Sequence, residues 1–215
     1  MTVTSVTIKK GVCVRVLGLD PAAAGLTGYG IIESDGRHCK LLHYGALRVT
    51  RARGKESSGA ALQDVHELVS RLIREFSPTV VAAESVFTAL NMRTALRLAE
   101  VRGVVLLAAA QHGLAVYSYS PREVKASVAG YGHADKRQIQ LMVRALLSMT
   151  ETPEPADAAD ALAVALCHLQ AEHARWRFNL PPEFGARPTS RVPSLAVTTT
   201  RRATRAAVSR IESTR

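Results

Sequence analysis

The sequence predicts an α/β fold in which a mixed five-stranded sheet, with three antiparallel strands followed by parallel additions, is flanked by helices on both faces. Two observations support this prediction. The first 50 residues hold three apolar, strand-like segments joined by short links. From residue 60 onward, segments with helical spacing alternate with apolar segments that are typical of strands. Strands that alternate with helices pair in parallel, and their helices cover the two faces of the sheet.

The three N-terminal segments are expected to form an antiparallel meander. Strands are predicted over residues 12–19, 28–33 and 40–49. Ser34-Asp35-Gly36 is a typical hairpin turn between the second and third strands. In the second strand, the glycines on both sides of Tyr29 indicate a close approach of another backbone rather than a loop that binds phosphate.

The rest of the folded region alternates between helix and strand. Residues 60–76 carry apolar side chains at helical spacing, and Ser77-Pro78 ends this helix. Two further strands are predicted over residues 79–84 and 114–119. The other predicted helices cover 94–111, a short segment from Pro121, 134–147 and 156–173.

Composition divides the chain into a flexible N-terminus at residues 1–11, one folded domain over 12–176 and a basic tail over 177–215. The tail contains eight arginines against Glu183 and Glu212, so it contributes about six of the ten net positive charges. Few of its residues can be buried, and we expect it to be disordered. The basic balance favours a polyanionic partner such as nucleic acid, although the folded domain by itself is only mildly basic.

Cysteine usage and hydropathy exclude several protein classes. The three cysteines, Cys13, Cys39 and Cys167, are far apart and form no C-x-x-C pair, which argues against a disulfide scaffold and a cysteine zinc site. The N-terminus lacks the pattern of a secretory signal, and no apolar run approaches the roughly 20 residues that span a bilayer. We therefore expect a cytoplasmic protein without a membrane partner.

Four carboxylates occupy positions that indicate a site. Asp20 and Glu84 each end an apolar strand, and open α/β sheets bind ligands beyond the carboxyl ends of their strands. Asp157 and Asp160 are three residues apart at the start of a predicted helix, so they share one of its faces. Taken alone, this second pair is more typical of acids that offset the helix dipole.

Taken together, the four acids would repel one another strongly if the fold brought them into a small space. A divalent cation relieves such repulsion, and carboxylate oxygens are the ligands that Mg²⁺ and Mn²⁺ prefer. Two such ions about 4 Å apart can stabilise both the attacking and the leaving oxygen of phosphodiester hydrolysis. Metal-dependent phosphodiester hydrolysis is therefore the chemistry that the acids predict.

Several motifs, in order along residues 12–168, resemble the RuvC family of Holliday-junction resolvases. The matching segments are LGLDP, TGYGII, AAESVF, TALRLAEVRGVVLLAA, PREVKASVAGYGHADKRQIQLMV and PADAADALAVALCH. The resemblance implies an RNase H-like nuclease domain, a homodimer and crossover junction endodeoxyribonuclease activity that depends on Mg²⁺, with Mn²⁺ able to substitute and two ions per active site. It also implies paired symmetric nicks in four-way junction DNA during homologous recombination and DNA repair, with the RuvA–RuvB branch-migration complex as a partner.

The resemblance assigns roles by position. The implied catalytic and metal-binding acids are Asp20, Glu84, Asp157 and Asp160. Phe87 matches the family's wedge at the opened junction, and Lys125 and Lys136 match two lysines that contact DNA phosphate near the cut. Arg122 and Arg137 lie near these lysines in the sequence, which indicates a DNA-binding face that follows the phosphate backbone.

Other interpretations compete with these assignments. By default, Lys125 and Lys136 are solvated surface lysines, and Phe87 is a core aromatic. A non-catalytic junction-binding protein with a vestigial metal site is an alternative function. A sugar-kinase or actin-like ATPase also places an acid after its first strand, but it needs a second such domain and glycine-rich phosphate loops that this chain lacks. The loop from Asp20 to Thr27 is one residue longer than in many RuvC members.

Overall fold

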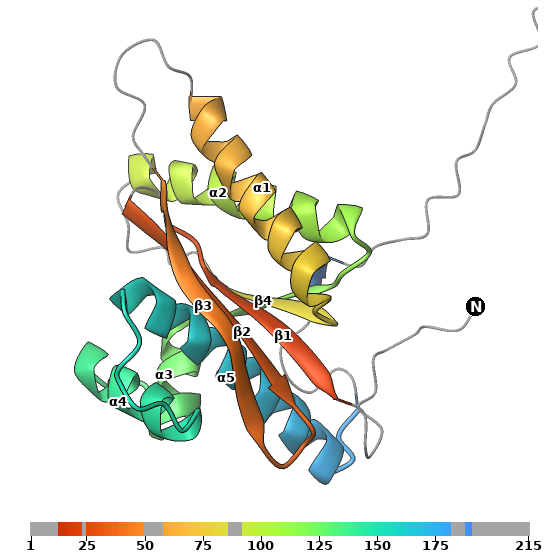
Figure 1. Ribbon diagram of the computed structural model, residues 1–215, viewed down its shortest axis with the longest axis vertical. Coiled ribbons are helices and arrows are strands. Elements are labelled where there is room, and N and C mark those ends of the chain that lie inside the picture. The colour runs from red at the N-terminus through yellow and green to blue at the C-terminus, as the bar shows by residue number, and fades with distance from the viewer. Residues whose placement is uncertain (1–12, 23–24, 50–57, 86–91, 182–187, 191–215) are drawn as a thin grey trace, which may run out of the picture.

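Residues 13–22, 25–49, 58–85, 92–181 and 188–190 are described by the computed structural model. The strands are β1 (Val14–Asp20), β2 (Gly25–Ser34), β3 (Cys39–Val49), β4 (Val80–Glu84), β5 (Val116–Tyr119) and β6 (Pro188–Ser190). The helices are α1 (Ser58–Phe76), α2 (Met92–Gln111), α3 (Pro121–Ala129), α4 (Lys136–Leu146) and α5 (Ala156–Arg177). In Figure 1 the sheet separates α1 and α2 on one side from α3, α4 and α5 on the other.

The sheet is mixed, with strand order β3-β2-β1-β4-β5-β6. As predicted, β1, β2 and β3 form an antiparallel meander, and β4 and β5 add to it in parallel. The prediction of five strands is wrong by one, because β6 pairs antiparallel with β5. The three residues of β6 lie in the predicted tail and lack the apolar pattern of a strand. They pair with backbone groups that would otherwise be exposed along the outer edge of β5.

Two hydrophobic clusters fill the two sides of the sheet, and strands β1 and β4 alternate between them. On β1, Val14 and Val16 belong to the cluster around α5, whereas Leu17 and Leu19 belong to the cluster beneath α1 and α2. On β4, Val80 and Ala82 belong to the α5 cluster. Val81 and Ala83 belong to the cluster beneath α1 and α2. Continuing this alternation by one step places both strand-end acids on the side of α5.

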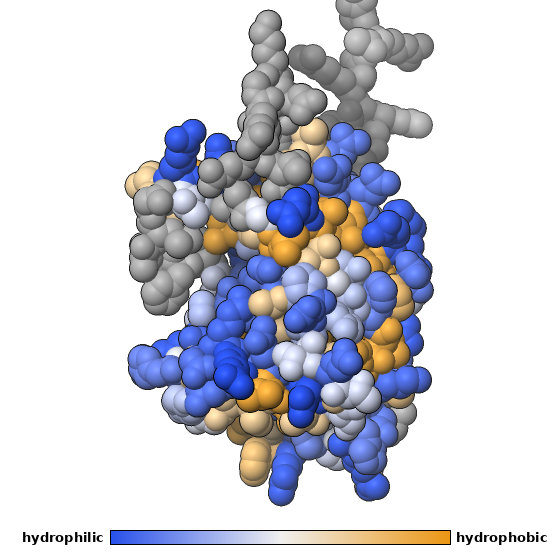
Figure 2. Space-filling model, turned by 60° about the vertical axis from the view of Figure 1, so that its left-hand side comes forward, coloured by the Kyte–Doolittle hydropathy of each residue, from blue (hydrophilic) through white to orange (hydrophobic). Residues whose placement is uncertain are grey.

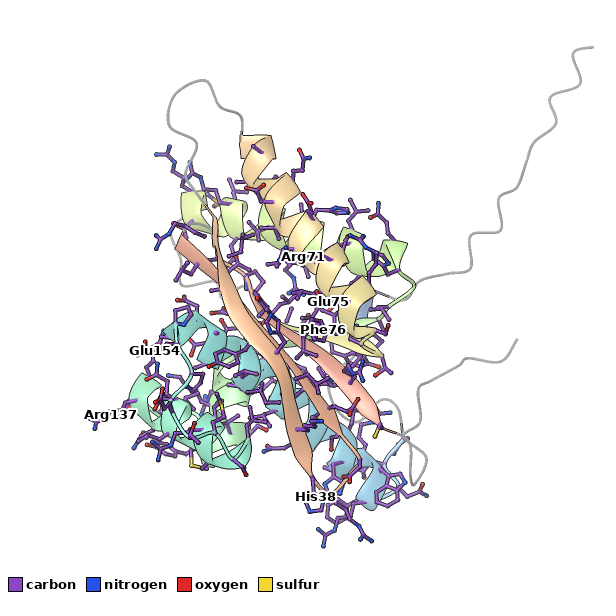
Figure 3. The ribbon with its side chains drawn as sticks, in the orientation of Figure 1. His38, Arg71, Glu75, Phe76, Arg137 and Glu154 are labelled. Carbon is purple, nitrogen blue, oxygen red and sulfur yellow. The ribbon has the colours of Figure 1, made fainter. Side chains whose placement is uncertain are left out.

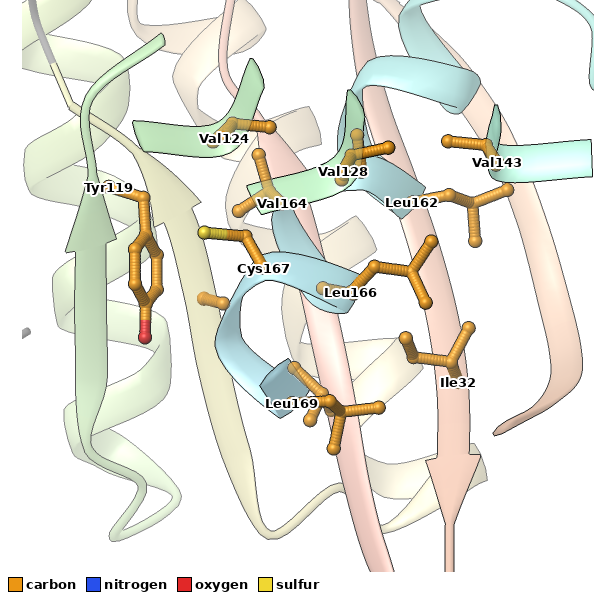
Figure 4. Close-up of a cluster of buried hydrophobic side chains, with 14 of the residues drawn as sticks. Ile32, Tyr119, Val124, Val128, Val143, Leu162, Val164, Leu166, Cys167 and Leu169 are labelled. Atoms are coloured by element: carbon orange, nitrogen blue, oxygen red, sulfur yellow. The ribbon is translucent and has the colours of Figure 1, made fainter. Parts of the chain in front are cut away.

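Helix α5 lies at the centre of its layer and is buried from Ala158 to Leu169 except at Asp160, which is half-buried. Figure 4 shows side chains of this helix, among them Leu162 and Leu166, in one cluster with Val124 and Val128 of α3 and Ile32 of β2. On the sheet side, glycines let the helix backbone approach closely. A Cβ atom at Gly28 would lie 1.9 Å from the backbone oxygen of Asp157, and one at Gly30 would lie 2.4 Å from Leu162. The predicted close approach of another backbone is therefore confirmed at Gly28, whereas at Gly30 the nearest atom belongs to the Leu162 side chain.

Two capping boxes define the starts of the short helices. Ser120 caps α3, and its side chain and that of Glu123 each bond to the other's backbone N–H. Asp135 and Gln138 make the same reciprocal contacts at the start of α4. This cap explains why α4 begins at Lys136, two residues later than predicted.

Within the described ranges, no helix is long and apolar enough to cross a bilayer. Figure 2 shows a face on which hydrophilic residues predominate and hydrophobic residues form separate patches.

Candidate functional site

Asp20 and Glu84 lie side by side at the carboxyl ends of two neighbouring parallel strands. The register of β1 and β4 pairs Leu19 with Ala83, so the two acids form the next pair along the ladder. Both face α5, and a hydrogen bond connects their side chains. The sheet thus holds two carboxyl groups in contact at the edge where the sequence predicted a site.

The first two turns of α5 bring Asp157 and Asp160 to the same edge. Gly28 is the antiparallel partner of Asp20, and its missing side chain leaves room for the backbone of Asp157. The residue that caps α5, Pro155, makes no side-chain capping bond. The interpretation of this acidic pair as a simple cap is therefore incomplete, because the charges of both residues act on Asp20.

In this arrangement, the pKa of Asp20 is strongly raised. Burial raises the pKa of Asp20 to about 8, together with the negative charges of Glu84, Asp160 and Asp157 and the hydrogen bond with Glu84. A carboxyl group with so high a pKa holds a proton near neutral pH when no cation is bound. The site therefore favours positive charge, either as protons or as a bound cation.

Glu84 shares this environment but has cations nearby. Burial is the largest cause that raises its pKa, and the charge of Asp160 adds to the rise. The hydrogen bond with Asp20 and the charges of Lys125 and Lys136 act in the opposite direction. The two lysines singled out in the sequence are thus both close enough to act on a strand-end acid.

A cleft of about 190 Å³ opens between β4, α3, α4 and α5. The Lys136 ammonium at its edge lies 2.9 Å from Oδ2 of Asp160, and this hydrogen bond is the largest cause that raises the pKa of Lys136. Lys125 is half-buried in the same cleft. The lining residues are Glu84, Lys125, Lys136 and Asp160, which are polar, and Pro121, Val124, Ile139 and Ala163.

The remaining predicted DNA-binding residues lie outside this lining. Arg122 on α3 and Arg137 on α4 are exposed, and Arg137 points away from the sheet in Figure 3. Phe87 lies outside the described residues, as do Ala23 and Ala24 in the loop after Asp20.

The donor atoms of the site fit a hard divalent cation better than any other cofactor. Carboxylates from three elements are near enough to act on one another, and their mutual repulsion contributes to the raised pKa of Asp20. With the side chains as they stand, no three His, Cys, Asp or Glu residues of the described part surround one point closely enough to hold an ion. A metal would have to draw the carboxylates together and compete with Lys136 for Asp160.

Two further polar residues were not assigned to the site from sequence. His168 shares a stripe of α5 with the acids but lies in the core, where its Nδ1 is 2.7 Å from the Tyr119 hydroxyl. Burial lowers the pKa of His168 to about 4, so it is neutral. Arg102 of α2 donates from Nη1 to the backbone oxygen of Glu84 at 3.2 Å. Its one sequence signal is that it stands alone before the apolar run GVVLLAAA.

Comparisons with known proteins agree on one family. A family model described as "Crossover junction endodeoxyribonuclease RuvC" matches residues 16–168. The chain is 46% identical over 162 residues to RuvC of Natranaerobius thermophilus, an alignment that covers 75% of this chain and 98% of the relative. It is 48% identical over 156 residues to RuvC of Caldicellulosiruptor saccharolyticus, with 72% of this chain and 92% of the relative covered.

Solved structures show the same likeness. Thermus thermophilus RuvC superposes with a TM-score of 0.68 at 32% identity, covering 81% of this chain and 99% of that one. The same protein in complex with a Holliday junction substrate gives a TM-score of 0.69 at 34% identity, with equal coverage. A yeast mitochondrial Holliday junction resolvase, at 15% identity and a TM-score of 0.54 over 78% of this chain and 83% of that one, shares the fold.

Proposed function

The chain belongs to the RuvC family of crossover junction endodeoxyribonucleases and is a Holliday-junction resolvase, and we propose that Asp20, Glu84, Asp157 and Asp160 carry its chemistry. The observation that supports this assignment is the meeting of four carboxylates from β1, β4 and α5 at one sheet edge. Their repulsion costs stability, and a cluster that costs stability without a cation is better explained by function than by folding.

We propose Mg²⁺ as the cofactor, with Mn²⁺ able to substitute and two ions per site. The four acids would hold it through hard oxygen ligands. When bound, it supplies Lewis-acid stabilisation of charge at the attacking and leaving oxygens of the phosphodiester. The support is the donor chemistry of the site and the raised pKa of Asp20.

The chain's own cations are proposed to handle the DNA strand. Lys125 and Lys136 line the cleft beside Glu84 and Asp160, where an ammonium group can contact the phosphate being cut. Lys136 would exchange its contact with Asp160 for one with phosphate. Arg122 and Arg137, exposed farther out, would track the flanking backbone. The proposed wedge role of Phe87 rests on its family position alone.

A homodimer is proposed because a four-way junction presents two symmetric strands, which a C2 pair of active sites can match. Helix α2 offers a surface for a second copy: the side chains of Met92, Leu96 and Leu107 are 75%, 59% and 53% exposed. Leu96 and Leu107 are eleven residues, or about three helical turns, apart and so share one stripe. Sedimentation should show that Leu96→Glu weakens the dimer, whereas Leu141→Glu on α4 leaves it intact. A dimer that survives Leu96→Glu would place the interface elsewhere.

Two wider assignments rest on family membership. We propose that the RuvA–RuvB complex is the partner that delivers the junction, and that the protein acts in the cytoplasm, where its DNA substrate would be found. The non-catalytic alternative is not favoured, because the relatives are endonucleases by name.

Incubation with a synthetic mobile four-way junction, in Mg²⁺ or in chelator, tests the proposed site. The wild-type chain should cut with Mg²⁺ and not with chelator. Asp157→Asn should bind the junction with unchanged affinity and cut at least about 1,000-fold more slowly, a loss of about 4 kcal/mol in transition-state stabilisation. Asp64→Asn removes an exposed carboxylate of α1 and should cut normally. Cutting by Asp157→Asn at the wild-type rate would refute the assignment.

A further inference from the structure

Arg102 connects the middle of α2 to the end of β4. Its Nη1 donates to the backbone oxygen of Glu84 at 3.2 Å, and its Nη2 donates to the Ser118 hydroxyl of β5 at 2.5 Å. One guanidinium group therefore holds the backbone of a proposed catalytic acid and the neighbouring strand at the same time. Its planar, forked donors suit such a double contact better than an ammonium group does.

The backbone oxygen of Glu84 needs a donor from outside the sheet. The N–H of the same peptide, which belongs to Ser85, donates to the Tyr119 oxygen of β5 at 2.8 Å. The Glu84 oxygen consequently points away from β5, toward β1. Extending the β1–β4 register puts Pro21 at the position that would donate next, and proline has no N–H. Arg102 supplies the donor that this ladder position lacks.

The contact continues to the C-terminal strand. The Ser118 hydroxyl lies 2.6 Å from Oγ1 of Thr189 in β6. Arg102 can only donate to the Ser118 oxygen, so the Ser118 proton is free to be given to Thr189. A continuous path of hydrogen bonds thus runs from β6 through β5 and α2 to the end of β4.

The position of Arg102 is costly for a residue that only packs. The side chain is half-buried, and burial lowers its pKa. Among the described residues, no carboxylate lies within ion-pair distance of it. A partly desolvated charge without an ionic partner reduces stability, and a methionine or leucine would fill the space at lower cost.

We propose that Arg102 is a positioning residue for cleavage: it fixes the Glu84 backbone, and therefore the direction of the Glu84 carboxylate, and the Ser118–Thr189 pair holds Arg102 in place. The inference rests on the proposed role of Glu84 and extends it to residues on α2, β5 and β6. The contact of Arg102 is with the backbone oxygen of Glu84, whereas Lys125 and Lys136 act on the carboxylate.

Single-turnover cleavage of a four-way junction by the full chain tests this role. Arg102→Gln should slow cleavage about 10- to 100-fold, the usual range for residues that orient a metal ligand. Its junction affinity, measured in chelator, should stay within about twofold of wild type, because no DNA contact is lost. Arg102→Lys keeps one donor and should recover part of the rate. Thermal melting should show a smaller Mg²⁺-induced rise in Tm for Arg102→Gln than for wild type.

Matched variants separate positioning from folding. Arg71→Gln removes an exposed arginine of α1, labelled in Figure 3, and should behave as wild type in every assay. Ser118→Ala and Thr189→Val remove one hydroxyl each and should slow cleavage by smaller factors, in that order. Ser118→Ala decides the question if Arg102→Gln does not fold.

The possible failures are distinct. Absence of cleavage by the wild-type chain would count against the proposed function. Wild-type cleavage that is matched by Arg102→Gln, or by Ser118→Ala in its place, would overturn the positioning role alone. Loss of cleavage in proportion to loss of junction affinity would overturn it as well, since a positioning residue changes the rate of the bound complex.

Discussion

The two ends of β1 differ in whether their acidic side chains have a basic partner within the chain. At its start, Arg15 faces Glu33 across the β1–β2 ladder, with Nη2 and Nε 2.6 and 3.0 Å from the same carboxylate oxygen. The Arg15 guanidinium also donates to the Phe76 carbonyl. At the other end, the last residue of β1, Asp20, lies near three further acids, and its pKa rises to about 8. Among the described residues, Glu33 has an ion-pair partner and Asp20 has none.

This difference separates charged groups that stabilise the fold from charged groups that are better explained by function. The charges at the start of β1 satisfy one another, so the folded state needs nothing further there. At the end of β1, the folded state gains stability when protons or cations neutralise the acids. The buried α5 core and its packing against the sheet must supply the stability that the carboxylates remove.

The largest expected effect is a pH-dependent stability that Asp20 causes in the absence of metal. The folded-state pKa of about 8 exceeds the unfolded value of 3.8, so the contribution of Asp20 to stability is fully present below about pH 4 and is lost as pH rises to about 8. In chelator, the free energy of unfolding of wild type relative to Asp20→Asn should fall by up to about 1.4 kcal/mol per pH unit across this window. Urea unfolding, followed by circular dichroism, measures both proteins.

The difference between the two proteins is the quantity that matters, because His168 acts in the opposite direction. Its folded-state pKa of about 4 lies below the ordinary 6.5, so its contribution is present above about pH 6.5 and is lost as pH falls toward 4. That contribution is common to both proteins and cancels. Mg²⁺ should stabilise wild type more strongly as pH rises, since its ligands must be deprotonated. A stability difference between wild type and Asp20→Asn that does not change with pH would contradict a raised pKa of Asp20 at the end of β1.

An intermediate effect is expected from Gly28, which lets α5 bring Asp157 up to Asp20. Gly28→Ala would place a methyl group against the Asp157 backbone, where even the ideal Cβ position is 1.9 Å from its oxygen. Overpacking of this kind should lower the free energy of unfolding by about 1–3 kcal/mol. The displaced helix start should also reduce cleavage and the Mg²⁺-induced rise in Tm. Wild-type stability together with a wild-type response to Mg²⁺ would mean that α5 can move without consequence for the site.

Local signals were enough to predict much of this architecture. Asp20 and Glu84 could be recognised because each interrupts an apolar strand at its carboxyl end, and Gly28 because glycine in a strand marks a close approach. Strand alternation then decides which face each acid occupies, and this was accessible only once the register was known. The convergence with Asp157 depended on the docking of α5, to which many distant residues contribute.

Features that depend on the partners of one side chain escaped sequence analysis. Arg102 bonds to a backbone oxygen and a hydroxyl that are distant in sequence, and neither has a residue-type signature. The three residues of β6 pair because an edge is available, not because of their own pattern. The contact of Lys136 with Asp160 requires the packing of α4 beside α5. The role of Phe87 stays a prediction, since that residue lies outside the described ranges.

The smallest expected effect, and the one with the opposite sign, is at the start of β1. Glu33→Gln keeps a hydrogen-bond acceptor but removes the charge that faces Arg15, whose side chain is 31% exposed against 24% for Glu33. Because both groups are partly solvated, the loss should be about 0.5–1 kcal/mol in urea unfolding, and it should shrink in high salt. Junction cleavage should be unchanged, because this residue is at the other end of the strand from the acids. Neutralising one acid should therefore destabilise the chain at Glu33 and, in chelator at pH 8, stabilise it at Asp20. The same sign at both ends would mean that the acids around Asp20 are already compensated within the protein, which would remove the electrostatic reason for a bound cation.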